Sequence, residues 1–222
     1  YYGYARQDRK TGPRTPITAK LVANLITSAG ADRVLTVDLH AGQIQGFFNI
    51  PVDELTALPL LSRYILDKKL RKLVAVAVDI GGTKRARNMA ERIQSSLAIV
   101  EKRRTGNDDT LETLNVIGEV AGREAVMVDD EIATGNSIIS TVQALKDRGV
   151  AGIYACCTHG VLSGDASERL SASSIEELVV TDTLPLDVKK LTGKTTILSV
   201  APLLGEAIHR IHNGLSVGAM FE

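Results

Sequence analysis

The sequence has no tryptophan, and aromatic residues make up only 4% of its 222 residues. Any core must therefore be aliphatic, and a hydrophobic content of 44% is ordinary for a globular protein of this length. Lys plus Arg and Asp plus Glu both number 26, so no excess of positive charge indicates a nucleic-acid partner. Neither an apolar run of transmembrane length nor a signal-peptide pattern is visible, so we expect no membrane contact.

Cysteine is also scarce, and its two occurrences, Cys156 and Cys157, are adjacent. A disulfide between sequence neighbours is sterically poor. Both residues lie in an apolar run, so we expect reduced thiols in the core of a cytoplasmic protein.

The chain opens on Tyr1-Tyr2-Gly3-Tyr4, which we interpret as the end of a strand. An initiator Met is lacking, and we therefore expect a truncated piece of a longer protein, with an incomplete first domain.

Short apolar runs alternate along the chain with segments of helical periodicity. The predicted strands are 34–37, 73–78, 125–128, 153–157, 178–180 and 195–200. The first predicted helix has Thr15 as its N-cap, Pro16 as its first residue and Gly30 as its C-terminal stop. Further helices are predicted after Pro59, over 86–97, over 138–145 and from 203 onward. This alternation indicates an α/β fold with parallel sheets, whose ligands bind beyond the carboxyl ends of the strands.

Three of the predicted strands end in Val-Asp, at Asp38, Asp79 and Asp129, and a Gly-containing loop follows each. This weak repeat suggests two tandem domains of related, Rossmann-like construction. We place the first domain in residues 1–55 together with 203–222, and the second in residues 56–202.

The strongest chemical signal is the segment 125–137, AVMVDDEIATGNS. Its apolar strand leads to Asp129 and Asp130, and a polar loop then opens a helix. The backbone N–H groups and the dipole of a helix N-terminus favour a phosphate there. The paired carboxylates can hold ribose hydroxyls or a Mg²⁺ bound to diphosphate. The plainer alternative is an acidic turn with an N-capping Ser137.

This loop resembles the motif that binds phosphoribosyl diphosphate (PRPP). Type I phosphoribosyltransferases and ribose-phosphate diphosphokinases (PRPP synthases) share this motif. Further stretches resemble the second family alone, and the similarity runs through all 222 residues. These stretches are YGYARQDRK at 2–10, DLHAGQIQGFF at 38–48, VDIGGTKRA at 78–86, KRR at 102–104 and CCTHGVLSG at 156–164. The resemblance implies two tandem phosphoribosyltransferase-type domains with parallel sheets.

The resemblance also implies transfer of the diphosphoryl group of ATP to the 1-hydroxyl of ribose 5-phosphate, giving PRPP and AMP. It assigns Arg6 and Gln7 to ATP, and His40 and Asp79 to Mg²⁺. Lys102 and Arg104 become catalytic residues that close over the substrates, while the role of Arg103 is less defined. The polar, Gly-containing stretch 105–109 that follows them is predicted to be a mobile loop. The implied ribose 5-phosphate site comprises Arg104, Asp129, Asp130, Ala133, Thr134, Gly135, Asn136 and Ser137. A homo-oligomer, commonly a hexamer, is implied as well.

Each of these residues also has a structural interpretation. Arg6 and Gln7 can be ordinary surface residues, and His40 a structural histidine. Asp79 can cap the following helix, and the 102–104 cluster can be a solvated run of charge. The family usually has Asp where this chain has Ala133, which predicts weaker substrate binding.

Two other functions compete with PRPP synthesis. A non-catalytic, PRPP-synthase-like regulatory subunit would keep the fold, but loss of site residues is its usual mark, and His40, Asp79, Lys102 and Arg104 are present. A salvage phosphoribosyltransferase would need a base-binding hood, and no segment suggests one.

Overall fold

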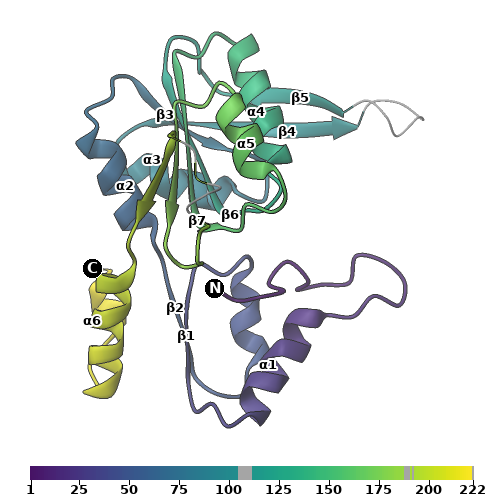
Figure 1. The fold of residues 1–222 in the computed structure, drawn as a ribbon, viewed down its shortest axis with the longest axis vertical. Coiled ribbons are helices and arrows are strands. Elements are labelled where there is room, and N and C mark those ends of the chain that lie inside the picture. Colours follow the sequence, from purple (N-terminus) through teal and green to yellow (C-terminus); the bar gives the residue numbers. More distant parts are fainter. Residues whose placement is uncertain (105–111, 188–190, 192, 222) are drawn as a thin grey trace. The chain divides into compact units, whose positions relative to one another are not determined.

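The computed structural model describes residues 1–104, 112–187, 191 and 193–221, without the side chains of 102–104, 112 and 113. The chain forms two compact units, Leu58–Leu198 and Tyr1–Ala57 with Ser199–Glu222 (Figure 1), and each is treated by itself. Because spatial contacts and not ancestry define these units, the predicted domain boundaries stay a prediction.

The larger unit is built on a seven-stranded sheet with the order β5-β4-β3-β6-β7-β8-β9. All neighbouring strands are parallel except β4 and β5, which pair antiparallel. The strands are β3 (Leu73–Ala77), β4 (Ser96–Arg104), β5 (Glu112–Ile117), β6 (Glu124–Ile132), β7 (Gly152–Gly160), β8 (Glu177–Thr181) and β9 (Thr195–Leu198). The helices are α2 (Leu58–Asp67), α3 (Thr83–Arg92), α4 (Asn136–Asp147) and α5 (Ala166–Ala172).

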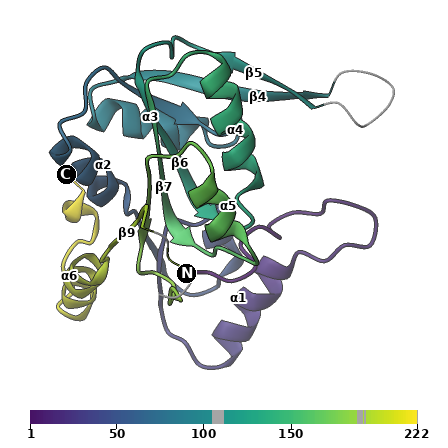
Figure 2. The same cartoon turned by 45° about the horizontal axis from the view of Figure 1, so that its top comes forward.

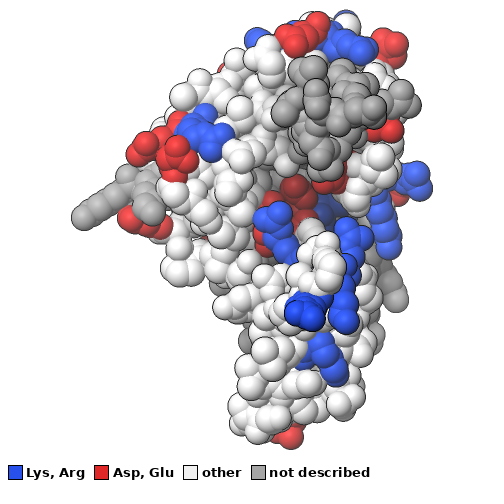
Figure 3. Space-filling model, turned by 90° about the vertical axis from the view of Figure 1, so that its right-hand side faces the viewer, with Lys and Arg blue, Asp and Glu red and all other residues white. Residues whose placement is uncertain are grey.

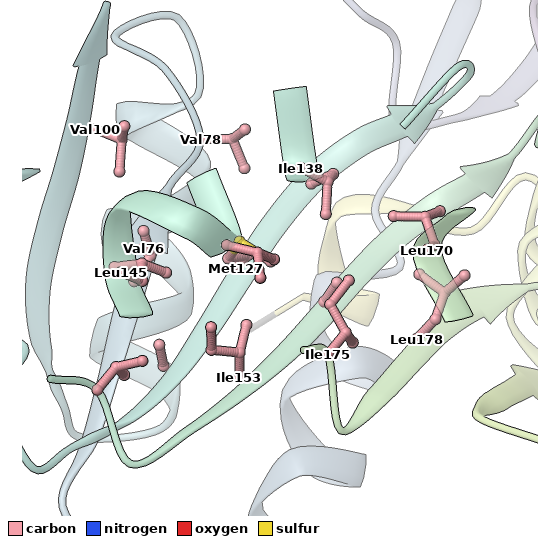
Figure 4. Packing of buried hydrophobic residues seen from close by; sticks show 14 of the residues in the cluster. Val76, Val78, Val100, Met127, Ile138, Leu145, Ile153, Leu170, Ile175 and Leu178 are labelled. Carbon is pink, nitrogen blue, oxygen red and sulfur yellow. The ribbon is translucent and has the colours of Figure 1, made fainter. Parts of the chain in front are cut away.

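Helices cover both faces of this sheet, α4 and α5 on one and α2 and α3 on the other (Figure 2). Successive side chains of a strand point to opposite faces, so each buried strand must be apolar throughout. Val76 and Met127 thus pack against Leu145 of α4 and Leu170 of α5 (Figure 4), while Ala77 packs on the α2–α3 side. This explains why uninterrupted apolar runs predicted the central strands well.

The same alternation separates the two cysteines. Cys157 belongs to the core under α4 and α5, and Cys156 to the core under α2 and α3. Both are free and buried, and burial raises the pKa of Cys156 to about 12 and that of Cys157 well above its ordinary value. The prediction of protonated core thiols is confirmed.

The smaller unit contains a two-stranded parallel sheet of β1 (Val34–Val37) and β2 (Val52–Leu55). Its other elements are α1 (Thr18–Ser28), η1 (Gly42–Phe47), α6 (Ala201–His212) and η3 (Gly218–Met220). The predicted strand at the start of the chain is wrong, because residues 3–6 form a turn. Tyr2 is buried through tertiary contacts instead: its hydroxyl donates to the carbonyl of Ala19 at 2.7 Å, and its ring packs edge-on against Phe48.

Two helix boundaries also differ from the prediction. Helix α1 begins at Thr18, and the hydroxyl of Thr15 donates to the Gly12 carbonyl at 2.7 Å instead of capping the helix. Helix α3 ends at Arg92, and Leu97 lies on β4, because Gln94 has a φ of 51° that breaks the helix.

A polar cluster ties α2 to the far end of the sheet. Oε1 of Glu177 accepts from the Tyr64 hydroxyl and from Thr196 of β9, both at 2.6 Å. Lys68 Nζ lies 2.6 Å from the other oxygen of Glu177. Burial opposes ionisation of Glu177, but the hydrogen bonds from Lys68, Thr196 and Tyr64 outweigh it and lower its pKa.

We expect Glu177→Gln to destabilise the chain by about 1–3 kcal/mol, because it removes a charged acceptor of three donors. Since the native pKa of Glu177 is depressed, this stabilisation is present above its unfolded pKa and is lost as the pH falls through the lower native value. Urea denaturation at pH 7 and pH 4 measures both effects. The exposed neighbour Glu176→Gln is the matched control, and equal effects of the two variants would contradict the assignment.

Candidate functional site

Two adjacent strands deliver the candidate carboxylates to one edge of the sheet. Strands β3 and β6 pair in parallel, with Ala77 opposite Val128. Asp79 follows Ala77 by two residues, and Asp129 follows Val128 directly. The pairing therefore brings the Asp79 loop and the Asp129–Asp130 pair together at the carboxyl edge, where ligands bind in open α/β sheets.

Asp79 lies in the loop between β3 and α3. Its Oδ1 accepts a hydrogen bond from the backbone N–H of Gly82 at 2.8 Å, and the Thr83 hydroxyl donates to the Ile80 carbonyl at 2.7 Å. Asp79 does not cap the next helix, because the N-cap residue of α3 is Gly82 and no side chain caps it. The hydrogen bond from Gly82 holds the Asp79 carboxylate in the loop, and a hard cation would find an oxygen ligand there.

Asp129 and Asp130 lie within β6, which continues to Ile132 and so extends beyond the predicted end of this strand at Val128. Asp130 is buried, at 4% exposure, whereas 28% of the Asp129 side chain is exposed. Arg85 of α3 holds the pair from the side: its Nη1 lies 2.8 Å from Oδ1 of Asp130 and 3.6 Å from Oδ1 of Asp129. Sequence reasoning missed Arg85, because no local pattern marks an ion pair between residues 45 positions apart.

Proximity and burial change the acidity of this pair. The pKa of Asp129 is raised to about 7, chiefly by burial and then by a hydrogen bond with Asp130 and its charge, while Arg85 and the backbone N–H of Asp130 oppose the shift. Two carboxyl groups that interact in this way titrate as a pair. A ligand that donates hydroxyl hydrogen bonds to them would offset the cost of their burial.

The predicted phosphate loop connects β6 to α4. Gly135 is the N-cap residue, with a φ of 74°, and no side chain caps the helix. The capping role suggested for Ser137 is therefore wrong. The backbone N–H groups of the first turn and the helix dipole give the N-terminus of α4 a positive potential that favours an anion such as a phosphate.

The segment after β7, which carried no predicted chemistry, braces this loop. The N–H of Leu162 donates to the carbonyl of Ile132 at 3.0 Å, and the N–H of Ser163 donates to that of Ala133 at 2.9 Å. From α5, Arg169 donates to Oδ1 of Asn136 at 2.7 Å. The bracing fixes the loop on which Thr134 and Gly135 lie.

The predicted catalytic residues Lys102 and Arg104 are strand residues. Both belong to β4, where they pair with Leu114 and Glu112 of β5, directly before the mobile loop predicted at 105–109. An antiparallel hairpin can expose one face to solvent, so its strands can carry charged residues. A run of charge in the sequence therefore does not distinguish such a strand from a loop. Their side chains, and all of residues 105–111, lie outside the described part of the structure.

Arg6, Gln7 and His40 lie in the smaller unit and are exposed. Gln43 donates to Asp8 at 2.8 Å, which places the segment after Gln7 against the loop that follows His40. The proposed ATP and metal residues of this unit therefore share one region of it. Among the described residues, no group of three His, Cys, Asp or Glu could hold a metal by itself.

The described surface is mixed in charge. At the top and at the left of the face drawn in Figure 3, acidic and basic side chains lie side by side. Within the described part of the chain, no helix has the length and apolar character needed to cross a membrane.

An α/β unit with a carboxylate pair beside a loop that opens a helix has the arrangement expected of a protein that binds a phosphorylated sugar. Comparison with known proteins narrows this class. Residues 1–30 match the model of the N-terminal domain of ribose phosphate pyrophosphokinase, and residues 108–222 match the phosphoribosyl synthetase-associated domain.

Ribose-phosphate pyrophosphokinases from Caldanaerobacter subterraneus subsp. tengcongensis and Oceanobacillus iheyensis are 54% and 51% identical over 222 residues, which is 100% of this chain and 70% of each relative. A crystal structure of phosphoribosylpyrophosphate synthetase from Mycobacterium smegmatis matches with a TM-score of 0.90 and 39% identity, covering 96% of this chain and 70% of that one. The chain belongs to the ribose-phosphate pyrophosphokinase family, as its resemblance to ribose-phosphate diphosphokinases predicted. The predicted fold of phosphoribosyltransferase type is confirmed.

We expect Gly135→Ala to destabilise the chain more than Gly149→Ala does. Both glycines have a φ near 74°, and a residue with a side chain costs about 1–2 kcal/mol in this conformation. A Cβ on Gly135 would also lie 3.2 Å from Cγ of Leu170, whereas nothing lies within 4 Å of one on Gly149. Crowding should add about 1–3 kcal/mol, and equal losses in urea denaturation would refute this packing of the loop.

The buried carboxyl pair predicts a pH-dependent effect of Asp129→Asn on stability. The native pKa of Asp129, about 7, lies above its ordinary value of 3.8. Between these two pH values the folded chain binds more protons than the unfolded chain, so it loses stability as the pH rises from the lower value to the higher. The variant lacks this loss, and its Tm should rise relative to the wild type from pH 5 to pH 8. Asp67→Asn, at an exposed carboxylate, is the control, and a constant Tm difference for Asp129→Asn would contradict the shift.

Proposed function

We propose that this chain performs the reaction of its family: it transfers the diphosphoryl group of ATP to ribose 5-phosphate and yields PRPP and AMP. The observation that carries the proposal is the convergence of Asp79, Asp129, Asp130 and the loop before α4 at one sheet edge. The family membership supports the same reaction. The ribose 1-hydroxyl oxygen forms a bond to the β-phosphorus, the bond from that phosphorus to the α,β-bridging oxygen breaks, and the hydroxyl proton is released.

The ribose 5-phosphate site follows from the geometry of β6 and α4. Residues 133–137 would hold the 5-phosphate, mainly through the backbone N–H groups of the first turn of α4. Asp129 and Asp130 would accept hydrogen bonds from the ribose hydroxyls. Ala133 lacks a carboxylate, so it can contribute only its backbone.

Arg6 and Gln7 would hold ATP, because a guanidinium and an amide suit phosphate and adenine. Asp79 and His40 would hold Mg²⁺, which takes few protein ligands and completes its shell with phosphate oxygens and water. When bound, Mg²⁺ neutralises part of the charge on the transferring group.

Lys102 and Arg104 would stabilise the negative charge that spreads over the diphosphoryl group in the transition state, and Arg104 would also contact ribose 5-phosphate. Their position on a hairpin arm suits residues that must approach a bound substrate. We further propose a cytoplasmic homo-oligomer, a hexamer by family resemblance, and the buried free thiols agree with a reducing compartment.

We expect Lys102→Ala to lower the rate of AMP formation from ATP by roughly 10²–10³-fold, because one transition-state cation is lost. The assay requires ribose 5-phosphate and Mg²⁺, and Lys146→Ala, at an exposed lysine near the end of α4, is the matched control. Folding should be unchanged in both variants. Unchanged turnover in Lys102→Ala would remove this residue from the mechanism, and AMP formation that does not depend on ribose 5-phosphate would refute the proposed reaction.

A further inference from the structure

Arg85 connects two parts of the proposed site that come from different strands. It lies in the first turn of α3, the helix that begins directly after the Asp79 loop. Its guanidinium reaches across to β6, where Nη1 lies 2.8 Å from Asp130 and 3.6 Å from Asp129. One cation is therefore shared between both carboxylates at the carboxyl edge of the sheet.

The burial of the three groups is graded. The Asp130 side chain is 6% exposed, that of Arg85 21% and that of Asp129 28%. Asp129 and Asp130 are also connected directly, since the N–H of Asp130 donates to Oδ1 of Asp129 at 2.9 Å. A buried carboxylate such as that of Asp130 is costly without a paired cation, and Arg85 supplies one.

We propose that Arg85 is a positioning residue of the ribose site. It touches neither ribose nor phosphate, but it fixes the direction in which Asp129 and Asp130 present their oxygens to the ribose hydroxyls. It also joins α3, and with it the Asp79 loop, to β6. This inference rests on the proposed function and adds a residue to it.

A planar guanidinium suits this role better than an ammonium. Its N–H groups form a rigid fork that can face two carboxylates at fixed angles, whereas an ammonium is a point charge on a flexible stem. Lysine at position 85 would keep the charge and lose the direction. The proposal therefore predicts an intermediate effect for Arg85→Lys, which a requirement for positive charge alone does not.

The experiment measures the affinity of ribose 5-phosphate by titration calorimetry for the wild type, Arg85→Met and Arg85→Lys. We expect the affinity to fall by about tenfold or more in Arg85→Met and by less in Arg85→Lys. Arg92→Met is the matched control, because Arg92 is an exposed arginine at the other end of the same helix, and it should bind as the wild type does. In the AMP assay, the KM for ribose 5-phosphate should rise more than kcat falls.

Asp130→Asn and its combination with Arg85→Lys complete a double-mutant cycle and keep the test decisive if Arg85→Met fails to fold. Non-additive losses of affinity support positioning through Asp130. Wild-type affinity in folded Arg85→Lys and Arg85→Met, or additive losses in the cycle, would overturn the role of Arg85 and leave the proposed function standing. Failure of the wild type to bind ribose 5-phosphate would instead overturn the proposed function, and the inference with it.

Discussion

The parallel ladder between β3 and β6 brings the ends of two strands to the same sheet edge, and the rest of the site depends on this pairing. Val76 lies opposite Met127 and Ala77 opposite Val128, so Asp79 and the Asp129–Asp130 pair emerge side by side. Apolar side chains on both faces stabilise the ladder, because helices cover it on each side. Asp79, Asp129 and Asp130 follow the apolar residues that the helices cover. A fold stabilised by aliphatic packing thus presents charged side chains at one edge of its sheet.

Ionisation of the buried carboxyl pair at that edge is energetically unfavourable, and a bound substrate would reduce this cost. Burial and a neighbouring carboxylate oppose ionisation of Asp129, and Arg85 only partly compensates. In the proposed site, a ribose that donates hydroxyl hydrogen bonds would add partners to this pair. The loop between β6 and α4 is held by hydrogen bonds from Leu162 and Ser163, which fix its backbone without a ligand. Binding at the proposed phosphate site would therefore require little rearrangement of the loop.

The sequence predicted those parts of the structure that depend on local pattern. The runs at 34–37 and 73–78 became β1 and β3, and β3 is almost fully buried, as its continuous apolar residues require. The sequence did not reveal that Lys102 and Arg104 extend along a hairpin, because a run of charge suits a strand and a loop alike. It could not find Arg85, because its partners come from another strand. The predicted strand at Tyr2 was based on the adjacent residues in the sequence alone. The burial of Tyr2 instead comes from its tertiary contacts with Ala19 and Phe48.

The central claim is that ribose 5-phosphate binds at the carboxyl edge of the larger sheet, and amide hydrogen exchange tests it most directly. Saturating ribose 5-phosphate should slow exchange at residues 134–137, where the first turn of α4 would hold the phosphate, and leave Gly149 and Ala151 at the opposite edge unchanged. Ribose without phosphate should protect the loop far less. Protection at the opposite edge, or none at residues 134–137 under saturating ligand, would contradict the account.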